Sequence, residues 1–368
     1  MKKFLFSTTA LAVAGAFAFG ADANAAAKPI KIGVGGFMTT EMGFGNNAGR
    51  FETGGVTGTG TSNKRSDFNN VQDSEVFFTG STKLDSGVTV SITIQLEADQ
   101  ARNGTQIDES YMKLTGGFGD LRLGSTTGTN SVLKHLAPYV GVGLDGGGSD
   151  NYISVPAAVT ASNSTNAATS GDANKIAYIS PRAGGLAVGF SFTPSTANAD
   201  TAPATGGNDG SDVQVIEGAL SYETTMGTSS VKADIAAENA SNNTTKVRAG
   251  LLIAAGGFTV GGSISKQNDS DDARTNLNTS LKRQAYDLGV SYAMGDYKFG
   301  VATAVGTVDV GDALEDSESK WSAGLQYTID TGVTGTLTYI NADYDDSTLT
   351  AASNNDGHAL IGQLKVSF

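Results

Sequence analysis

The sequence contains no cysteine, only two histidines and one tryptophan, and six prolines in 368 residues. Without cysteine, a disulfide framework, a thiol nucleophile and Cys-ligated zinc or iron–sulfur sites are excluded. Two histidines cannot form a three-histidine metal centre, so metal binding is restricted to Ca²⁺ or Mg²⁺ held by carboxylates. We therefore expect a protein that works without a resident cofactor.

Positive charge is scarce as well. The chain has 24 Lys and Arg against 37 Asp and Glu, giving a net charge of −13 and a pI of about 4.5. Binding to nucleic acid requires clustered basic residues that replace the counterions of the phosphates. A nucleic-acid partner is therefore not expected.

Long apolar runs are missing except at the N-terminus. There Lys2 and Lys3 precede an apolar run over residues 4–20, and Ala23-Asn24-Ala25 has the small-x-small pattern that signal peptidase recognises. This pattern predicts a cleaved signal peptide over residues 1–25 and an exported mature chain of residues 26–368. A membrane anchor is less favoured, because the run is short and ends in a cleavage site. No other stretch approaches the ~20 residues that a membrane-spanning helix needs.

What the mature chain does contain is alternation of apolar and polar residues, as in residues 88–97, where Val88, Val90 and Ile92 share one face. Such period-two runs predict β-strands. Sixteen runs are present, at residues 30–43, 71–84, 87–98, 107–116, 119–126, 174–181, 185–194, 213–224, 229–238, 245–255, 257–266, 283–294, 296–306, 319–329, 333–343 and 357–368.

The connections between these runs alternate in length. Short Gly-bearing turns, such as Gly256-Gly257, suit tight hairpins. Between them come long polar segments at residues 44–70, 99–106, 127–173, 195–212, 239–244, 267–282, 307–318 and 344–356. Short turns on one side and long loops on the other are typical of a transmembrane β-barrel. A soluble sandwich is the alternative, but sixteen consecutive hairpins without a Greek-key crossover argue against it.

The charged residues follow the same alternation. Across the strand centres, nearly all of them fall on the face that we assign to the inside, where lipid cannot penalise them. The predicted inward basic residues are Lys31, Lys83, Lys113, Arg122, Lys175, Lys232, Lys246, Arg248, Lys298 and Lys365. The predicted inward acidic residues are Glu41, Glu75, Glu97, Glu109, Glu217, Asp234, Glu238 and Asp287. These inward charges predict a water-filled lumen whose wall is nearly charge-balanced. Outward aromatic residues gather near the strand ends, which predicts two aromatic girdles at the membrane interfaces.

Three segments carry a resemblance to a known family. Residues 108–124 read as a strand pair with a tight turn, residues 175–194 contain Ser180-Pro181 between two strands, and Phe368 ends the last alternating strand. In these features the mature chain resembles Gram-negative general porins of the alphaproteobacterial type, which are trimeric sixteen-stranded diffusion pores of the outer membrane.

The resemblance implies that the longest loop, about residues 127–173 between the fifth and sixth strands, folds into the barrel and narrows it. It also implies that acidic loop residues face basic wall residues, which produces a transverse field in the constriction. The candidate constriction residues are Asp145 and Asp150 on the loop, and Lys113, Arg122 and Glu97 on the wall. The loop is rich in small residues, which predicts discrimination mainly by size.

Four long segments, at residues 195–212, 267–282, 307–318 and 343–356, carry fifteen Asp and Glu against Arg274 and Lys282. Such a mouth attracts cations at low salt. Ca²⁺ bound there could bridge to neighbouring lipopolysaccharide; ordinary solvation of the loops is the simpler interpretation. Outer-membrane lipids, lipopolysaccharide, small solutes and two further copies of the chain, in a homotrimer that the resemblance implies, are the expected partners.

The sequence therefore favours passive diffusion of small hydrophilic solutes and ions through an outer-membrane pore. The alternative is a barrel with a closed lumen that acts as a surface adhesin or receptor. An outer-membrane hydrolase is a third option, but neither His135 nor His358 has a Ser or carboxylate partner at a diagnostic spacing. No enzymatic activity is expected.

Overall fold

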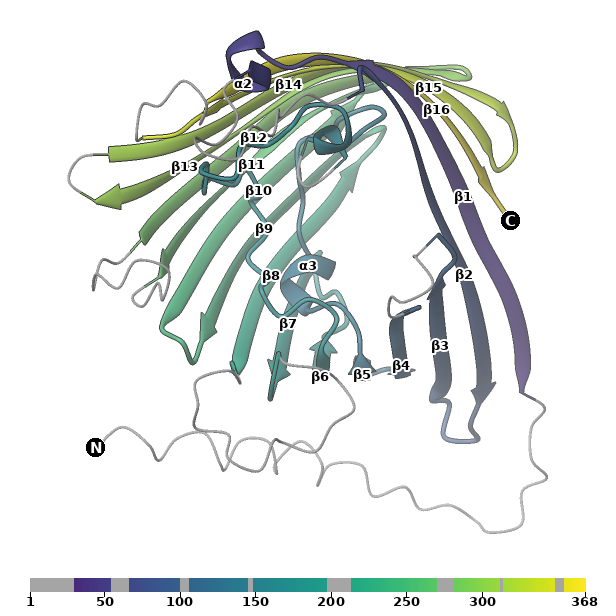
Figure 1. Ribbon diagram of the computed structural model, residues 1–368. Helices are drawn as coiled ribbons and strands as arrows, with labels where there is room; N and C mark the ends of the chain where they lie inside the picture. Colours follow the sequence, from purple (N-terminus) through teal and green to yellow (C-terminus); the bar gives the residue numbers. More distant parts are fainter. Residues whose placement is uncertain are drawn as a thin grey trace.

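Sixteen antiparallel strands form one closed barrel (Figure 1). The structure is a computed structural model that describes residues 30–53, 66–99, 106–144, 148–196, 213–269, 281–311, 314–347 and 354–368. The predicted signal peptide, residues 1–25, precedes these ranges, and its cleavage stays a prediction. The predicted fold, an all-β barrel of sixteen strands, is confirmed.

The strands are β1 (Lys31–Gly45), β2 (Phe68–Lys83), β3 (Thr89–Glu97), β4 (Ile107–Gly116), β5 (Gly119–Ser125), β6 (Asn174–Ile179), β7 (Leu186–Thr193), β8 (Val215–Met226), β9 (Ser229–Ala240), β10 (Thr244–Ala255), β11 (Phe258–Asp269), β12 (Leu281–Met294), β13 (Tyr297–Gly311), β14 (Leu314–Asp330), β15 (Val333–Asp345) and β16 (Asn355–Ser367). Two short helices, α2 (Gly49–Thr53) and α3 (Thr129–Val132), and the 3₁₀ turn η1 (Ser149–Asn151) lie in connections. Within the described ranges, no helix is long and apolar enough to cross a membrane.

The first and last strands close the barrel. Strand β1 pairs with β2 on one side and with β16 on the other, in register from Phe37↔Ser367 to Gly45↔Ala359. Beyond that ladder, the backbones of Gly36 and Phe368 exchange two hydrogen bonds of 3.0 Å. Closure satisfies the backbone groups that an open sheet would expose at its edges, which is a requirement for spanning lipid.

The tight turns use glycine where the backbone needs positive φ. Between β10 and β11, Gly256 and Gly257 have φ values of 56° and 86°. A two-residue hairpin of this kind requires positive φ at both central positions, which costs glycine little. The predicted alternation of Gly-bearing turns with longer connections is confirmed here.

Two predicted loops are shorter than expected. Strand β13 extends to Gly311 and β14 begins at Leu314, so most of the predicted loop at residues 307–318 is strand. Similarly, only residues 241–243 separate β9 from β10. The predicted strands end where acidic and amide side chains begin, but in a barrel with a wet interior such side chains continue the inward face of the strand.

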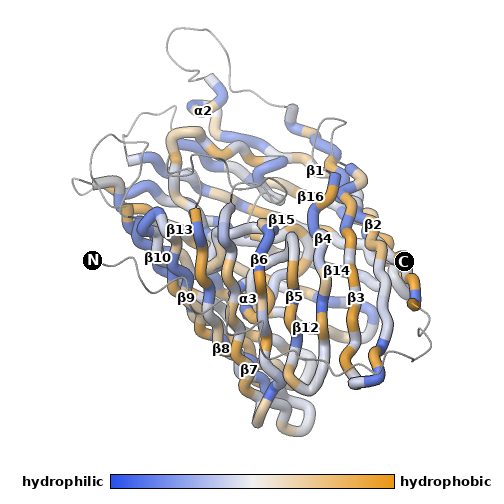
Figure 2. Tube along the Cα trace, turned by 90° about the horizontal axis from the view of Figure 1, so that it is seen from below, coloured by the Kyte–Doolittle hydropathy of each residue, from blue (hydrophilic) through white to orange (hydrophobic). Residues whose placement is uncertain are grey.

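The outer surface is apolar. Figure 2 shows hydrophobic and hydrophilic residues alternating along the strands. Large apolar side chains such as Phe190, Leu288 and Val301 are exposed on it, as expected for positions that face lipid. Outward aromatic side chains contact one another across strands near the tight turns, with ring centroids 4.4 Å apart for Phe258 and Tyr292 and 4.9 Å for Tyr297 and Tyr327.

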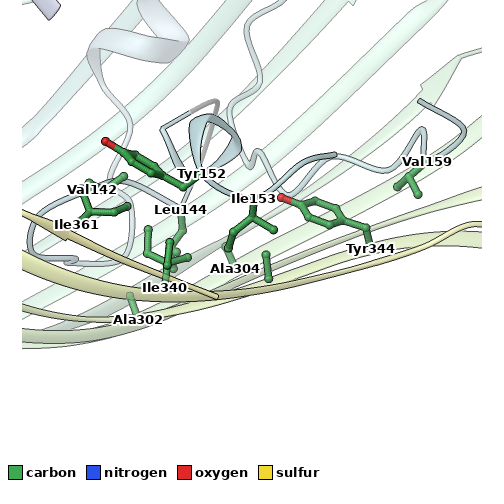
Figure 3. Packing of buried hydrophobic residues seen from close by; sticks show 12 residues of the cluster. Val142, Leu144, Tyr152, Ile153, Val159, Ala302, Ala304, Ile340, Tyr344 and Ile361 are labelled. Atoms are coloured by element: carbon green, nitrogen blue, oxygen red, sulfur yellow. The ribbon is translucent and has the colours of Figure 1, made fainter. Parts of the chain in front are cut away.

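The connection between β5 and β6, residues 126–173, lies inside the barrel, and we call it the inner loop. Figure 1 shows α3, which belongs to it, between the wall formed by β1–β4 and the wall formed by β6–β13. Its apolar residues Leu144, Tyr152 and Ile153 are buried against Ile340 and Tyr344 of β15 (Figure 3). The main apolar core of this barrel is therefore the contact between the loop and part of the inner wall.

Candidate functional site

Seven wall carboxylates hold the backbone of the inner loop. Each accepts a hydrogen bond from one backbone N–H of the loop, and we call them the anchor carboxylates. The pairs are Glu109 with Thr127 (2.6 Å), Glu217 with Asn130 (3.1 Å), Asp234 with His135 (2.7 Å), Asp287 with Ala137 (2.8 Å), Asp316 with Thr160 (2.9 Å), Glu318 with Asn163 (3.2 Å) and Glu238 with Thr169 (2.6 Å). An irregular loop cannot satisfy its own amides, and a hydrogen bond to an ionised group is stronger than a neutral one.

Two basic side chains satisfy loop carbonyls in the same way. Arg248 donates to the carbonyl oxygens of Thr165 (3.0 Å) and His135 (2.9 Å), and forms an ion pair with Asp234. Lys175 donates to the carbonyl oxygens of Gly171 (2.7 Å) and Ala173 (2.8 Å). Both side chains are buried. These two charges therefore hold the loop rather than face the water of the lumen.

Wall glycines provide the space in which the loop backbone lies. A Cβ atom at Gly324 would be 2.0 Å from the carbonyl oxygen of Val140, and one at Gly250 would be 2.2 Å from that of His135. On β13, a Cβ at Gly306 would be 2.1 Å from the carbonyl oxygen of Ser162. Since real Cβ atoms do not approach so closely, a larger residue at these positions would push the loop off the wall.

The inner loop crosses the wall twice. We call residues 127–144 the outgoing leg and residues 156–173 the return leg. Side-chain amides join the two legs: Asn130 Nδ2 donates to the carbonyl oxygen of Ala167 (2.7 Å), and Asn163 Nδ2 to that of Leu144 (2.8 Å). The legs thus form a double layer on strands β7–β15, and of the seven anchor carboxylates only Glu109 lies on β1–β5. From that wall, Asn69 and Ser125 donate to the carbonyl oxygens of Asn151 (2.8 Å) and Asp172 (2.5 Å) at the turn of the loop and at its end.

On that opposite wall, the predicted basic pair lies together. Lys113 on β4 and Arg122 on β5 are directly paired in register. The Arg122 guanidinium lies 5.7 Å from the ring centroid of Tyr111, at cation–π distance. Both side chains are partly exposed, so the lumen keeps two adjacent positive charges at this point.

The wall also carries an acidic cluster, nearer to the long-loop end. Glu97 on β3 pairs in register with Glu75 on β2, and carboxylate oxygens of Asp73, Glu75 and Glu97 lie within 4.8 Å of one another. A β-bulge between β3 and β4 adds Asp108, which accepts a 3.1 Å hydrogen bond from Gln95. Such carboxylates could hold a divalent cation. As they stand, they concentrate negative charge beside the pore.

The predicted loop acids have different positions. Asp150 forms a 2.8 Å ion pair with Lys320 on β14 and accepts a 3.2 Å hydrogen bond from the hydroxyl of Tyr344 on β15. It is therefore held by the wall behind the loop, where it shares Lys320 with Glu318. Asp145 belongs to residues 145–147, which the structure does not describe. The structure thus brings Lys113 and Arg122 together and brings Glu97 into the acidic cluster. It places Asp150 against Lys320 and not against these groups.

Asp172, at the end of the return leg, is the third loop acid. Burial and the neighbouring carboxylates of Asp108 and Glu109 raise the pKa of Asp172 to about 6. Lys175 acts in the opposite direction but does not cancel these effects. Asp172 therefore changes its charge within the ordinary experimental pH range.

His135 has partners that its sequence position did not reveal. Its Nε2 lies 3.4 Å from the hydroxyl of Ser221 and 3.9 Å from Glu223, and burial lowers its pKa. A serine-hydrolase triad needs the hydroxyl and the carboxylate on opposite ring nitrogens. Here both approach the same nitrogen, and Ser221 is fully buried. His358 stacks on Tyr339 at 6.0 Å on the outer face. Neither histidine is arranged for catalysis.

Sequence reasoning missed three residues that hold the loop: Asp316, Glu318 and Lys320. The two acids belong to a predicted outer loop, yet both are buried anchor carboxylates, and Lys320 binds Glu318 as well as Asp150. The signal was present, since these residues alternate with period two and lead directly into the strand that contains Ser322. Continuing the alternation through charged positions would have found them.

Comparisons with known proteins point to outer-membrane porins and channels. The sequence matches the profile of a family described as Gram-negative porin over residues 7–348. No curated protein matches. The anion-selective porin from Comamonas acidovorans has a similar structure, with a TM-score of 0.63 and 16% identity, covering 92% of this chain and 100% of that one.

Two further solved structures are similar. The outer membrane channel DcaP of Acinetobacter baumannii has a TM-score of 0.63 at 11% identity, covering 92% of this chain and 97% of that one. OmpT of Vibrio cholerae, described in a trimer form, has a TM-score of 0.62 at 10% identity, covering 93% of this chain and 100% of that one. At these identities the structures establish the fold alone.

Proposed function

Because the chain belongs to the Gram-negative porin family, we propose that its inner loop forms the constriction of a water-filled channel. The protein is an outer-membrane channel for passive diffusion of small hydrophilic solutes and ions, and it is not an enzyme. Passage through such a channel requires no cofactor chemistry and no energy input. The alphaproteobacterial subtype stays a prediction.

One observation carries the proposal for the constriction. The anchor carboxylates fix the loop at seven points along two legs, so the loop occupies part of the lumen as a rigid layer. Solutes would then pass between the exposed face of this layer and the wall of β1–β5. That wall presents Lys113, Arg122 and the acidic cluster around Glu97.

Reconstitution into planar bilayers tests the function. The purified protein should produce stepwise increases in conductance in KCl as single channels insert. A protein that binds the bilayer but produces no steps would contradict a diffusion pore and favour the closed-lumen adhesin or receptor.

We also propose that ion preference depends on Glu97 more than on Asp150. Asp150 forms an ion pair with Lys320 on the wall behind the loop, whereas Glu97 lies among other carboxylates. Glu97→Gln should therefore reduce cation preference, measured by the reversal potential across a KCl gradient, by more than Asp150→Asn does. Lys113→Gln should shift the potential in the opposite direction. If Asp150→Asn changed the reversal potential more than Glu97→Gln does, ion preference would depend on the loop and not on the acidic cluster. Asp145→Asn extends the same test to the predicted residue that the structure does not describe.

A homotrimer in contact with lipopolysaccharide is proposed for the assembled state. The trimer form of the similar Vibrio OmpT supports it, as does the apolar outer surface that a membrane protein can bury against lipid or another subunit. Chemical cross-linking in outer-membrane preparations should trap trimers; monomers alone would contradict this. Ca²⁺ at the acidic outer segments stays a prediction, because residues 197–212, 270–280 and 348–353 are not described.

A further inference from the structure

A polar cavity of about 440 Å³ opens above the return leg of the inner loop. Its floor is the inner wall of β10, β11 and β12, and its ledge is the side of the return leg that carries Thr160, Ser162 and Ser164. Because the lining residues of these strands lie toward the ends that carry the longer connections, a solute entering from that side reaches the cavity before the constriction. We call this cavity the vestibule shelf.

The shelf has a regular floor. Lys246, Gln267 and Arg283 form one row across three neighbouring strands, paired in register. In the next row towards the tight turns, Arg248 is buried beneath the loop, and Ser265 and Ala285, which line the cavity, are small. The volume falls within the roughly 300–1,000 Å³ of typical small-molecule sites.

The charges on the shelf are balanced. Arg283 forms a 3.2 Å ion pair with Asp269. Lys246 lies directly across from Glu238 on β9 in register. Since each cation has an adjacent anion, the shelf has no excess charge with which to attract a simple anion or cation.

The other lining groups are hydroxyls and amides. Ser162, Ser164 and Thr244 contribute hydroxyls that are able to donate and to accept. The hydroxyls of Thr169 and Ser265 donate to Glu238 and to the carbonyl oxygen of Ser164, and the Gln267 amide donates to Asp269, so these groups offer their oxygens as acceptors. An apolar ligand would leave these groups without hydrogen bonds, which is costly. A neutral solute with many hydroxyl groups meets both donors and acceptors.

We propose that the vestibule shelf is a binding site for small neutral polyhydroxylated solutes of monosaccharide size. The proposal rests on the channel function and adds a solute class to it. Binding there raises the local solute concentration at the entrance to the constriction. It must stay weak, because a solute held tightly would not pass on.

The test uses D-glucose as the probe on single channels in planar bilayers. Glucose added to the side of the longer connections should increase open-channel current noise and saturate in the millimolar range. The double variant Ser162→Ala, Ser164→Ala removes two hydroxyls from the ledge and should raise the half-saturation concentration by about thirtyfold, at roughly 1 kcal/mol for each of the two lost hydrogen bonds. Thr93→Ala, which removes a hydroxyl from the inner wall of β3, is the matched control and should behave like the unmodified protein.

Two results would overturn the proposal. One is a glucose effect that does not saturate, or that is equal in the unmodified protein and the double variant. The other is stronger saturable binding of gluconate than of glucose, which would assign the shelf to anions. The same recordings test the channel function separately. Stepwise conductance in KCl without a saturable glucose effect would contradict only glucose binding at the vestibule shelf. Absence of conductance steps before glucose is added would contradict the channel function itself.

Discussion

Carboxylates on the inner wall have two distinct roles in this barrel. Those opposite the inner loop, such as Glu217 and Glu238, are buried and accept hydrogen bonds from loop amides. Those on the wall of β2 and β3, Asp73, Glu75 and Glu97, cluster beside the open lumen. The sequence pattern places both groups on the same face of their strands, and only the path of the loop distinguishes them.

Glu217 is the anchor on which a single substitution is most informative. Its side chain accepts hydrogen bonds from Asn130 N–H (3.1 Å) and from the hydroxyls of Ser191 (2.9 Å) and Ser170 (2.9 Å). Glu217→Gln keeps the volume but replaces one acceptor by a donor that faces donors. We expect the free energy of unfolding to fall by about 1–3 kcal/mol and open-channel noise to rise. The control is Glu315→Gln, at an exposed position on β14; if it has an equal effect, anchoring is not the cause.

The charge of Asp172 depends on pH. With a pKa raised to about 6, Asp172 is ionised at pH 8 and neutral at pH 4.5. A raised pKa means that the folded protein favours the protonated form, so the stability that protonated Asp172 contributes is fully present below about pH 3.9 and is lost as the pH rises to about 6. Asp172→Asn should reduce cation preference relative to the unmodified protein at pH 8. The two reversal potentials should converge below pH 6, and a difference that persists at pH 4.5 would contradict the assignment.

Strands β10–β15 are shaped to receive the loop. Their inner face combines glycines at the points of closest backbone approach, such as Gly250, Gly306 and Gly324, with small or apolar residues such as Ala304 and Ile340. In Figure 3 the loop side chains lie directly over the apolar positions. A wall that faced only water would need neither feature, so the composition of these strands reflects loop contact.

Gly324 tests this role. A Cβ there would meet the carbonyl oxygen of Val140 at 2.0 Å, whereas a Cβ at Gly218 on β8 would meet no atom within 4 Å. Gly324→Ala should displace the outgoing leg, change single-channel conductance and lower stability by about 1–3 kcal/mol. Gly218→Ala should leave both unchanged. Equal conductance in the two variants would show that the loop does not need close contact at Gly324.

The elements were more predictable than the site. All sixteen strands follow from period-two alternation, and the tight turns follow from glycine, because both depend on local sequence. The path of the inner loop is not local: Asp150 binds Lys320, and His135 lies near Ser221, through contacts between distant parts of the chain. Neither partner is recognisable from spacing. The acidic run around Asp316 was misassigned because charge was interpreted as exposure to bulk solvent.

At the level of the whole molecule, the barrel has two surfaces and one interior layer. The outer face is apolar, the inner wall of β1–β5 is charged and wet, and the inner loop covers much of the remaining wall. The excess of acidic residues is therefore divided among loop anchoring, the lumen cluster and the outer segments. A closed sheet of this kind has no need of a fully packed centre, which is consistent with the high glycine content of 49 residues.

The central claim is that the inner loop borders the conducting path, and the absence of cysteine makes it directly testable. Tyr139, on the outgoing leg, has 42% of its surface exposed, and Phe190 on the outer face has 47%. Each is replaced by cysteine in turn, and a charged, membrane-impermeant thiol reagent is added during single-channel recording. Modification of Tyr139→Cys should produce an abrupt fall in conductance, while Phe190→Cys should show none. Unchanged conductance after confirmed labelling of Tyr139→Cys would contradict a loop-lined constriction.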